Sequence, residues 1–269
     1  MKGTTKSLGR KNALDKFYTK YDIAARLIEN FNFSNYDLII EPSAGNGAFS
    51  KQIQNCLALD IAPQDDSIIQ QDFFTFSPSL EGKILTIGNP PFGEQAKLAI
   101  DFFNYAAKFS TTIAFILPKS FKKISIQNRL DLNFHLVKEE ELPTDSFLLE
   151  GEDYSVPCIF QIWERKNEKR VKIKTPTTSN YFDFTKDKEK ADFRIQRVGG
   201  KAGVAFNDKE GAISSNYYLI NKSQFSTEEL VKILNTIVYY SLEDTVGPKS
   251  LPKGELISES NIILQEKSH

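Results

Sequence analysis

Short apolar runs alternate with segments of helical periodicity over the first 165 residues, and this alternation constrains the fold more than any other feature. The runs that predict buried strands are Asp37 to Ile40, Cys56 to Ile61, Lys83 to Gly88, Thr111 to Leu117, Leu136 to Leu142 and Pro157 to Trp163. The segments with helical spacing are Asp22 to Phe31, a stretch from Ala48, and Glu94 to Phe109. Strands that alternate with helices form a parallel sheet covered on both faces, so we predict an α/β fold with a mostly parallel sheet.

The composition excludes several classes of protein. The 21 Phe and 10 Tyr residues bring too much apolar surface for a disordered chain. Two cysteines and two histidines are too few for a disulfide framework or a structural zinc site, so no metal is expected. The sequence contains neither an apolar run long enough to span a membrane nor a secretory signal. We therefore expect a soluble, cytoplasmic protein that does not bind membranes.

Charge is unevenly distributed along the chain. The first 20 residues carry six basic side chains against one acidic residue, Asp15, which is typical of a solvated arm or of a segment that contacts phosphates. From Arg165 to Lys201, 12 basic residues stand against five acidic ones, and a helix is expected later, over Thr227 to Tyr240. The predicted organisation is a basic arm (1–20), an α/β domain (15–165) and a smaller second domain (166–269).

Polar residues follow the first two predicted strands. Glu41 and Pro42 precede a turn in which Gly45 and Gly47 allow a ligand to approach the backbone closely. The third glycine of the dinucleotide fingerprint is absent, which argues against a nicotinamide or flavin cofactor. Asp60 ends the second strand, where a carboxylate typically accepts hydrogen bonds from ribose hydroxyls. A carboxylate at the end of the first strand favours a cationic or amine-bearing ligand over a pyrophosphate.

Two further segments point to the same edge of the sheet. Asp72 and Phe73 lie where the next loop passes the pocket, and this pair is suited to an adenine, although Asp72 alone would be an ordinary loop residue. Asn89-Pro90-Pro91-Phe92 is the most specific feature of the chain. The two prolines fix the backbone after a buried strand, so they hold the Asn89 amide and the neighbouring carbonyls rigidly beside an aromatic ring.

Together, these motifs resemble a known family. Glu41 to Phe49 (EPSAGNGAF) followed by NPPF resembles the S-adenosylmethionine-dependent amino methyltransferases, above all the DNA adenine-N6 class. Asp15 to Thr19 resembles the N-terminal cofactor motif of this family, and Thr144 to Trp163 resembles the motif whose aromatic residue meets the other face of the target base. The order of the motifs is that of the gamma group, and the resemblance covers about residues 15–165.

The resemblance implies a Rossmann-like class I methyltransferase fold, S-adenosylmethionine as the cofactor and a small C-terminal target-recognition region. The residues that it assigns to the cofactor are Phe17, Thr19, Glu41, Pro42, Gly45, Gly47, Asp60, Ile61, Asp72, Phe73 and Asn89. The residues that it assigns to catalysis are Asn89, Pro90, Pro91 and Phe92, with Phe92 and Phe147 stacking on a flipped adenine and Phe121 as a rival to Phe147. The nucleic-acid contacts expected from the basic stretch are Lys172, Lys174, Arg194, Arg197 and Lys201.

The expected activity is methylation of the N6 amino group of adenine in DNA, as in restriction–modification systems. An adenine-N6 methyltransferase acting on RNA is the alternative, because the NPPF site reads only the base and its amino group. A protein-glutamine methyltransferase and a non-catalytic binding subunit of the same fold are further alternatives. The second domain is small, so we expect a short recognition sequence, relaxed specificity or help from a partner subunit.

Overall fold

The computed structural model describes residues 17–79, 81–242 and 248–268, and the chain divides into two compact units. Unit 1 holds the chain up to Pro118 together with Arg129–Val171. Unit 2 holds Lys119–Asn128 and the chain from Lys172 onward. Most of the predicted basic arm lies outside the described residues, since the description begins at Phe17.

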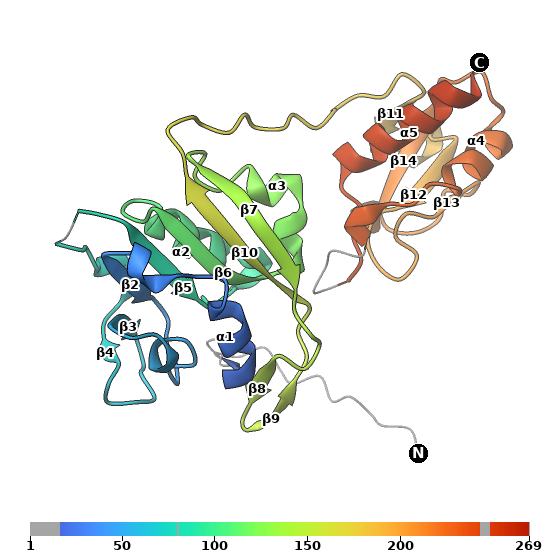
Figure 1. The fold of residues 1–269 in the computed structure, drawn as a ribbon. Helices are drawn as coiled ribbons and strands as arrows, with labels where there is room; N and C mark the ends of the chain where they lie inside the picture. Colours follow the sequence, from blue (N-terminus) through green and yellow to red (C-terminus); the bar gives the residue numbers. More distant parts are fainter. Residues whose placement is uncertain (1–16, 80, 243–247, 269) are drawn as a thin grey trace. The chain divides into compact units, whose positions relative to one another are not determined.

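Unit 1 is built on a seven-stranded sheet in the order β4-β3-β2-β5-β6-β10-β7 (Figure 1). The strands are β2 (Leu38–Glu41), β3 (Cys56–Asp60), β4 (Ile69–Gln70), β5 (Ile84–Gly88), β6 (Thr112–Pro118), β7 (Phe134–Glu141) and β10 (Cys158–Arg165). Strand β10 runs antiparallel to its two neighbours, β6 and β7, and the other strand pairs of this sheet are parallel. The central strands β5 and β6 are buried along their whole length, as expected for a sheet that is covered on both faces. The predicted α/β fold with a mostly parallel sheet is confirmed.

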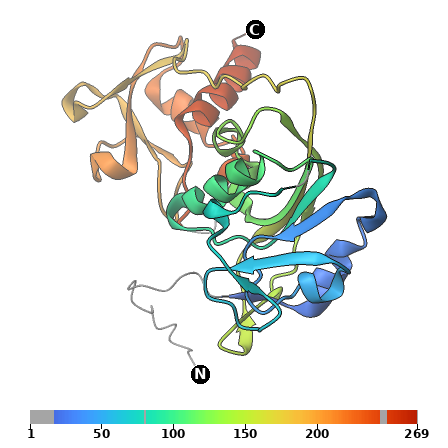
Figure 2. The ribbon, with the colours of Figure 1, turned by 90° about the vertical axis from the view of Figure 1, so that its left-hand side faces the viewer.

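Helices α1 (Tyr21–Ile28) and α2 (Lys97–Ala106) cover opposite faces of this sheet (Figure 2). The Trp163 ring of β10 packs against Phe103 of α2. On β7, Glu140 pairs in register with Phe160 of β10 and forms an ion pair with Arg26 of α1. Because residues 160 and 163 of one strand point to opposite faces, the two helices lie on opposite sides.

A second, three-stranded sheet joins the start of the described chain to a later hairpin. Strand β1 (Tyr18–Thr19) pairs antiparallel with β8 (Phe147–Leu149), which in turn pairs with β9 (Glu152–Tyr154). The hairpin turn uses Glu150 and Gly151, both with positive φ, as a two-residue turn of type I′ requires. Lys20 forms ion pairs with Asp153 at 2.7 Å and with Asp145 at 3.8 Å. The sequence did not predict this hairpin, which places Thr19 opposite Phe147.

Unit 2 has its own sheet and its own core. The four antiparallel strands lie in the order β11 (Phe182–Thr185), β14 (Asn216–Asn221), β12 (Phe193–Gln196) and β13 (Ala205–Phe206). The helices of unit 2 are α3 (Ile124–Gln127), α4 (Thr227–Leu234) and α5 (Lys253–Lys267). The core joins side chains of the sheet, such as Phe193 and Leu219, to Leu230 of α4 and Leu256 of α5. Unit 2 therefore has a hydrophobic core that is separate from the large sheet.

The helices of unit 2 differ in part from the sequence-based expectation. The helix predicted over Thr227 to Tyr240 ends at Leu234, although a capping box between Ser226 and Glu229 fixes its start as expected from the sequence. Helix α5 was not predicted, because weak helix formers such as Gly254 and Asn261 interrupt its apolar positions. None of the described helices combines the length and the apolar character that a membrane span requires.

Candidate functional site

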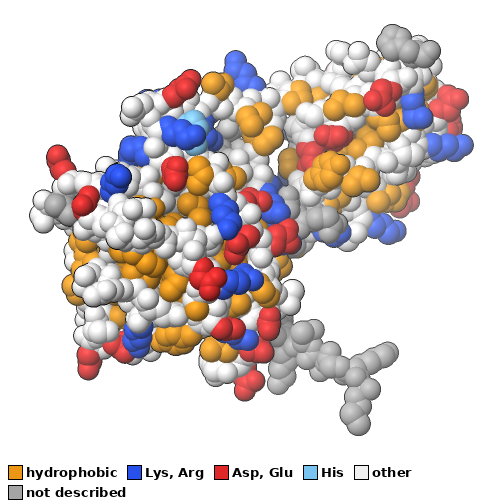
Figure 3. Space-filling view, viewed as in Figure 1, with side chains coloured by type: hydrophobic (Ala, Val, Ile, Leu, Met, Phe, Trp, Pro, Cys, Tyr) orange, Lys and Arg blue, Asp and Glu red, His pale blue; other side chains and the backbone are white. Residues whose placement is uncertain are grey.

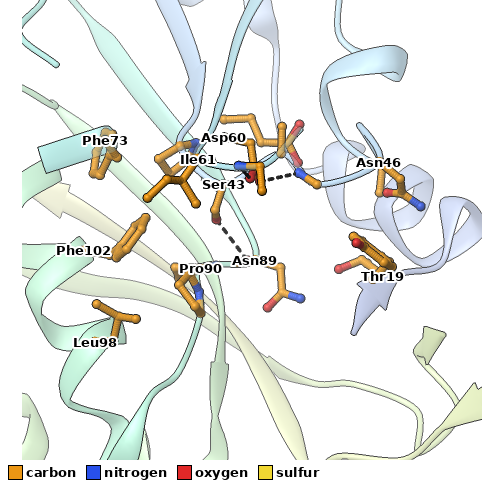
Figure 4. Close-up of a pocket in the computed structure, with 18 of the residues that line it drawn as sticks. Thr19, Ser43, Asn46, Asp60, Ile61, Phe73, Asn89, Pro90, Leu98 and Phe102 are labelled. Carbon is orange, nitrogen blue, oxygen red and sulfur yellow. Dashed lines mark hydrogen bonds between the residues drawn. The ribbon is translucent and has the colours of Figure 1, made fainter. Parts of the chain in front are cut away.

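The carboxyl ends of the parallel strands bring the predicted polar residues together around one cavity. Glu41 ends β2, Asp60 ends β3, Asp72 follows β4, and Asn89 follows β5. The cavity has a volume of about 320 Å³, and all the residues predicted to hold the cofactor line it except Gly47. In Figure 4, the apolar side chains of Phe73, Phe102 and Leu98 lie at one end of the cavity. The polar side chains of Thr19 and Asn46 lie at the other end.

The glycine turn between β2 and β3 adopts a backbone that only glycine accepts without strain. Gly45 has a φ of +55°, and a Cβ atom added there would meet the ring of Tyr18 at 2.9 Å. The helix predicted from Ala48 is absent, and the chain forms only a short 3₁₀ turn over Ser50–Gln52. The expected row of free helix N–H groups is therefore missing. Instead, the N–H groups of Gly45 and Ser50 are occupied by the two carboxylates of the site.

Glu41 is a carboxyl group buried at the floor of the cavity, with 2% of its surface exposed. Its Oε2 atom accepts a hydrogen bond of 2.8 Å from the N–H of Ser50. Burial raises the pKa of Glu41 to about 7, and the hydrogen bond to Ser50 opposes this shift only in part. A cationic ligand beside Glu41 would favour the ionised form, so the site is suited to a positively charged group.

The second carboxylate, Asp60, is held by two backbone donors. Its Oδ2 atom accepts from the N–H of Gly45 at 2.8 Å, and its Oδ1 atom accepts from the N–H of Ala62 at 2.8 Å. Each carboxylate oxygen keeps acceptor capacity beyond these bonds. Asp60 is thus fixed in position at the cavity wall and remains able to accept hydrogen bonds from ligand hydroxyls.

The apolar end of the cavity combines an aromatic ring with a carboxylate. Asp72 accepts from the N–H of Phe74 at 2.9 Å and so caps the 3₁₀ turn that carries Phe73. The ring of Phe73 stacks on that of Phe102 with centroids 5.3 Å apart. Ile61 also lines the cavity, although 59% of the residue's surface is exposed. Flat apolar walls next to an acceptor are suited to a heteroaromatic ring with an amino group.

Asn89 carries the most unusual feature of the site. Its side-chain oxygen, Oδ1, is buried and has no hydrogen-bond partner in the described part of the chain. The main-chain carbonyl of Asn89 accepts from the hydroxyl of Ser43 at 3.1 Å, and Pro90 and Pro91 continue the cavity wall. The Oγ1 atom of Thr19 is buried and unpartnered in the same way. A buried acceptor without a donor costs free energy, so these two atoms indicate where a ligand would bind.

The rings predicted to stack on a target base do not line the cavity. Phe92 is 7% exposed and Phe147 is fully buried, and the ring of Phe17 contacts both of them edge-on. The rival ring, Phe121, is fully buried as well. In this structure, the faces of Phe92 and Phe147 are therefore covered by protein, and their stacking on a base stays a prediction.

The predicted nucleic-acid contacts differ in their availability. Lys172, Lys174, Arg197 and Lys201 are exposed in unit 2, although Arg197 also donates to the carbonyl of Ser214 at 3.0 Å. Arg194 is buried instead, because its guanidinium donates to both carboxylate oxygens of Asp208 and to Asn216. We therefore remove Arg194 from the set of expected phosphate contacts. The earlier basic residue Arg165 is also engaged, because it donates to main-chain carbonyls beyond the end of α2.

Figure 3 shows how charge is distributed on one face of the molecule. Lys and Arg side chains are interspersed there with Asp and Glu, and no broad patch of one sign is visible on that face. Clusters of three or more His, Cys, Asp or Glu residues that could hold a metal ion are absent from the described residues.

Some residues of the site were not predicted from the sequence. Tyr18 packs its ring over Gly45, and burial together with the charge of Asp60 raises its pKa. Ser43, Leu98 and Phe102 complete the cavity wall. Tyr18 lies between two predicted residues, Phe17 and Thr19, so its position in the motif is the one signal that could have identified it. Ser43 likewise lies within the Glu41–Phe49 motif, whereas Leu98 and Phe102 carry no recognisable sequence signal.

Neither a protein-family model nor a curated protein matches the chain. Among solved structures, a Pyrococcus horikoshii protein described as a candidate RNA methyltransferase is similar over 59% of this chain and 92% of its own, with 16% identity and a TM-score of 0.42. The 23S rRNA methyltransferase ErmE is similar over 57% of this chain and 70% of its own, with 14% identity and a TM-score of 0.41. A Thermoplasma acidophilum protein is similar over 56% of this chain and 89% of its own, with 18% identity and a TM-score of 0.41. Similarities at this level do not bear on activity.

Proposed function

We propose that this protein is an S-adenosylmethionine-dependent methyltransferase that methylates the N6 amino group of adenine in DNA. The observation that carries the proposal is the buried, unpartnered Oδ1 atom of Asn89, held beside two prolines at the wall of a cavity that also contains Glu41 and Asp60. The resemblance of the NPPF and glycine-turn motifs to the adenine-N6 class supports the same reaction. The motif order, with a second unit after the catalytic one, supports DNA as the substrate.

The residues around the cavity fit the methyl donor. Glu41 and Thr19 would bind its amino acid part, Asp60 its ribose hydroxyls, and Asp72 with Phe73 its adenine ring. Gly45 lines the cavity without a side chain, so a ligand could lie close to the backbone of the glycine turn. When bound, S-adenosylmethionine supplies an electrophilic methyl group on a positively charged sulfur.

Asn89 and Pro90 would orient the target amino group. The N6 lone pair of adenine is delocalised into the ring, which makes this nitrogen a poor nucleophile. Two acceptors, the Oδ1 atom of Asn89 and the carbonyl of Pro90, would favour a tetrahedral nitrogen whose lone pair points at the methyl group. They would also stabilise the positive charge that develops on the nitrogen, and the proton can leave after the transfer.

The target base must leave its helix to reach these acceptors. Unstacking costs a few kcal/mol, and stacking on an aromatic ring is worth about 1–3 kcal/mol per base, so Phe92 and Phe147 would offset part of this cost. Contacts to phosphates would come from the exposed residues Lys172, Lys174, Arg197 and Lys201 in unit 2. A partner subunit remains part of the proposal for target recognition, because unit 2 is small.

The experiment that tests the proposal is transfer of labelled methyl groups from S-adenosylmethionine to matched pools of DNA and RNA. Products would be digested to nucleosides and identified by mass spectrometry, with Asn89→Ala as the inactive control. We expect N6-methyldeoxyadenosine. Label found only in RNA would support the proposed reaction but would show that the substrate is RNA and not DNA. Label on another base, or on an atom of adenine other than N6, would contradict the proposal.

A further inference from the structure

Phe17 lies between the two rings that the proposed function assigns to the target base. Its centroid is 5.3 Å from that of Phe92 and 4.9 Å from that of Phe147, with interplanar angles of 63° and 76°. A third ring, that of Tyr154 in β9, lies 5.7 Å away. Edge-to-face contacts at these distances are favourable aromatic pairs. Phe17 therefore fills space that borders both of the proposed stacking residues.

Neither stacking residue offers an open face to a base in this structure. Phe147 is fully buried and Phe92 is 7% exposed, so a base can stack on them only after a neighbouring group has moved. Phe17 also lines the cavity, as does Asn89 with its unpartnered Oδ1 atom, whereas Phe92 and Phe147 do not line it. The ring of Phe17 is thus a cavity residue that contacts both of the proposed stacking rings.

The three rings differ in the described structure around them. Phe92 follows two prolines that fix its backbone at the end of β5. Phe147 belongs to β8, which is paired on one side with β1 and on the other with β9. Phe17 is half-buried and directly precedes β1, whereas Phe92 and Phe147 are buried. A rotation of the Phe17 side chain would therefore displace the most exposed ring of the three.

Tyr18 and Phe17 point to different parts of the site. Successive residues of an extended segment face opposite sides, and the ring of Tyr18 lies against Gly45 of the cofactor turn while that of Phe17 lies against Phe92. Phe17 can therefore move without withdrawing Tyr18 from the glycine turn. The sequence resemblance assigned Phe17 to the cofactor, whereas its ring contacts are with the residues assigned to the base.

We propose that Phe17 occupies, in the free protein, the place of the flipped target base between Phe92 and Phe147, and that it must be displaced for the base to bind. This inference rests on the proposed function, because Phe92 and Phe147 receive their roles from it. In this role Phe17 is a positioning residue. It keeps two apolar ring faces dry when no base is present, and it excludes any base that does not bind well enough to replace it.

The test measures base binding separately from methyl transfer. We would measure the binding of two nucleosides, adenosine and 2-aminopurine riboside, in the presence of S-adenosylhomocysteine. The fluorescence of 2-aminopurine is quenched when the base stacks and so reports its binding. The proteins compared are the wild type, Phe17→Ala, Phe17→Leu and Phe92→Ala. We expect Phe17→Ala to bind both nucleosides about tenfold more tightly than the wild type. In the variant, the base no longer has to replace the aromatic contacts of Phe17, and a tenfold change corresponds to about one such aromatic pair. Phe17→Leu should show a smaller gain, and Phe92→Ala should bind more weakly. All four should bind S-adenosylhomocysteine equally well.

Three results would overturn the inference. Weaker nucleoside binding by Phe17→Ala would make Phe17 a permanent wall of the base site, and unchanged binding would remove it from that site. A lower affinity of Phe17→Ala for S-adenosylhomocysteine would show that Phe17 belongs to the cofactor site. Phe33→Ala is the matched control, since Phe33 is another half-buried ring of unit 1 and pairs with Phe31 instead of the cavity residues. Failure of the proposed function would be seen separately, as a wild type that transfers no methyl group to adenine whatever the nucleoside affinities.

Discussion

At the scale of single residues, the unpartnered side-chain oxygen of Asn89 leads to separate predictions for the stability of the protein and for its rate of methyl transfer. Because the acceptor is already unsatisfied in the free protein, Asn89→Ala removes a buried polar group without breaking a hydrogen bond of Oδ1. We expect methyl transfer to fall by about 100-fold or more, as for the loss of one preorganised polar group, while the melting temperature stays the same or rises. Single-turnover kinetics and thermal unfolding measure the two effects.

Asn104→Ala is the matched control for Asn89→Ala. The Asn104 amide is fully engaged, donating to the carbonyl of Arg129 and accepting from the N–H of Asp131. Its loss should cost about 1–2 kcal/mol of stability with no specific effect on transfer. If Asn89→Ala destabilised the protein as much as Asn104→Ala, a structural role for Asn89 would replace the catalytic one.

Glu41 predicts a pH dependence with a definite sign. Its pKa lies near 7 in the folded protein against an ordinary value of 4.5, so the folded state holds a proton that the unfolded chain releases. The stability of the free protein should therefore decrease as the pH rises from about 4.5 to 7 and level off above. Binding of a cationic ligand needs the ionised carboxylate, so the affinity for S-adenosylmethionine should increase over the upper part of the same range.

Glu41→Gln separates this effect from the other titrations of the protein. The variant lacks the ionisable group, so the stability decrease between pH 4.5 and 7 should be smaller than in the wild type. Its cofactor affinity should be lower and should no longer rise near pH 7. Thermal unfolding and calorimetric titration across this range provide both curves, and parallel curves for the variant and the wild type would rule out a folded-state shift at Glu41.

At the scale of elements, the glycine turn and β1 behave as one unit. Tyr18 covers Gly45, and the hydroxyl of Tyr21 donates to the carbonyl of Asn46 at 3.0 Å. Gly45→Ala combines an unfavourable positive φ with a clash at 2.9 Å against the Tyr18 ring, so the turn and β1 must separate. We expect at least about a tenfold loss of cofactor affinity, equivalent to about 1.4 kcal/mol.

Gly200→Ala is the control for this substitution. A Cβ atom at Gly200 meets nothing within 4 Å, and the residue does not have a positive φ. Calorimetric titration with S-adenosylhomocysteine should show wild-type affinity for Gly200→Ala and weakened affinity for Gly45→Ala. Equal affinities would show that the turn tolerates separation from Tyr18.

Elements with strong local patterns could be predicted from the sequence, and those that depend on long-range pairing could not. The apolar runs Asp37 to Ile40, Cys56 to Ile61 and Lys83 to Gly88 predicted three of the strands and therefore the edge of the sheet where the cavity lies. The helix expected from Ala48 is absent, and in its place Ser50 donates its N–H to the buried Glu41. The pairing of β1 with β8 joins residues about 130 positions apart, so no local signal could place Phe17 against Phe147.

At the scale of the whole molecule, the net charge of −1 conceals an uneven use of basic residues. The sequence identified a basic stretch after residue 165 but could not tell which of its cations already have partners. Arg165 is used within unit 1, and Arg194 is buried with Asp208 in unit 2. The local surplus of charge therefore overstates the number of side chains that a phosphate could contact.

The salt dependence of nucleic-acid binding tests which cations take part. Each phosphate contact contributes about 0.9 to the slope of log K against log salt on duplex DNA, because binding releases condensed counterions. The four exposed residues Lys172, Lys174, Arg197 and Lys201, replaced together by Ala, should lower the slope by about 0.9 for each one that contacts a phosphate. The affinity for S-adenosylhomocysteine should not change, since these residues belong to unit 2 and the cavity to unit 1.

Arg194→Ala should instead lower the stability of unit 2, since it leaves Asp208 without its arginine partner. Wherever the protein stays folded, this variant should keep the wild-type slope of log K against log salt. A slope that is unchanged in the fourfold variant but reduced in Arg194→Ala would reverse this assignment and place the phosphate contacts on the face that carries Asp208.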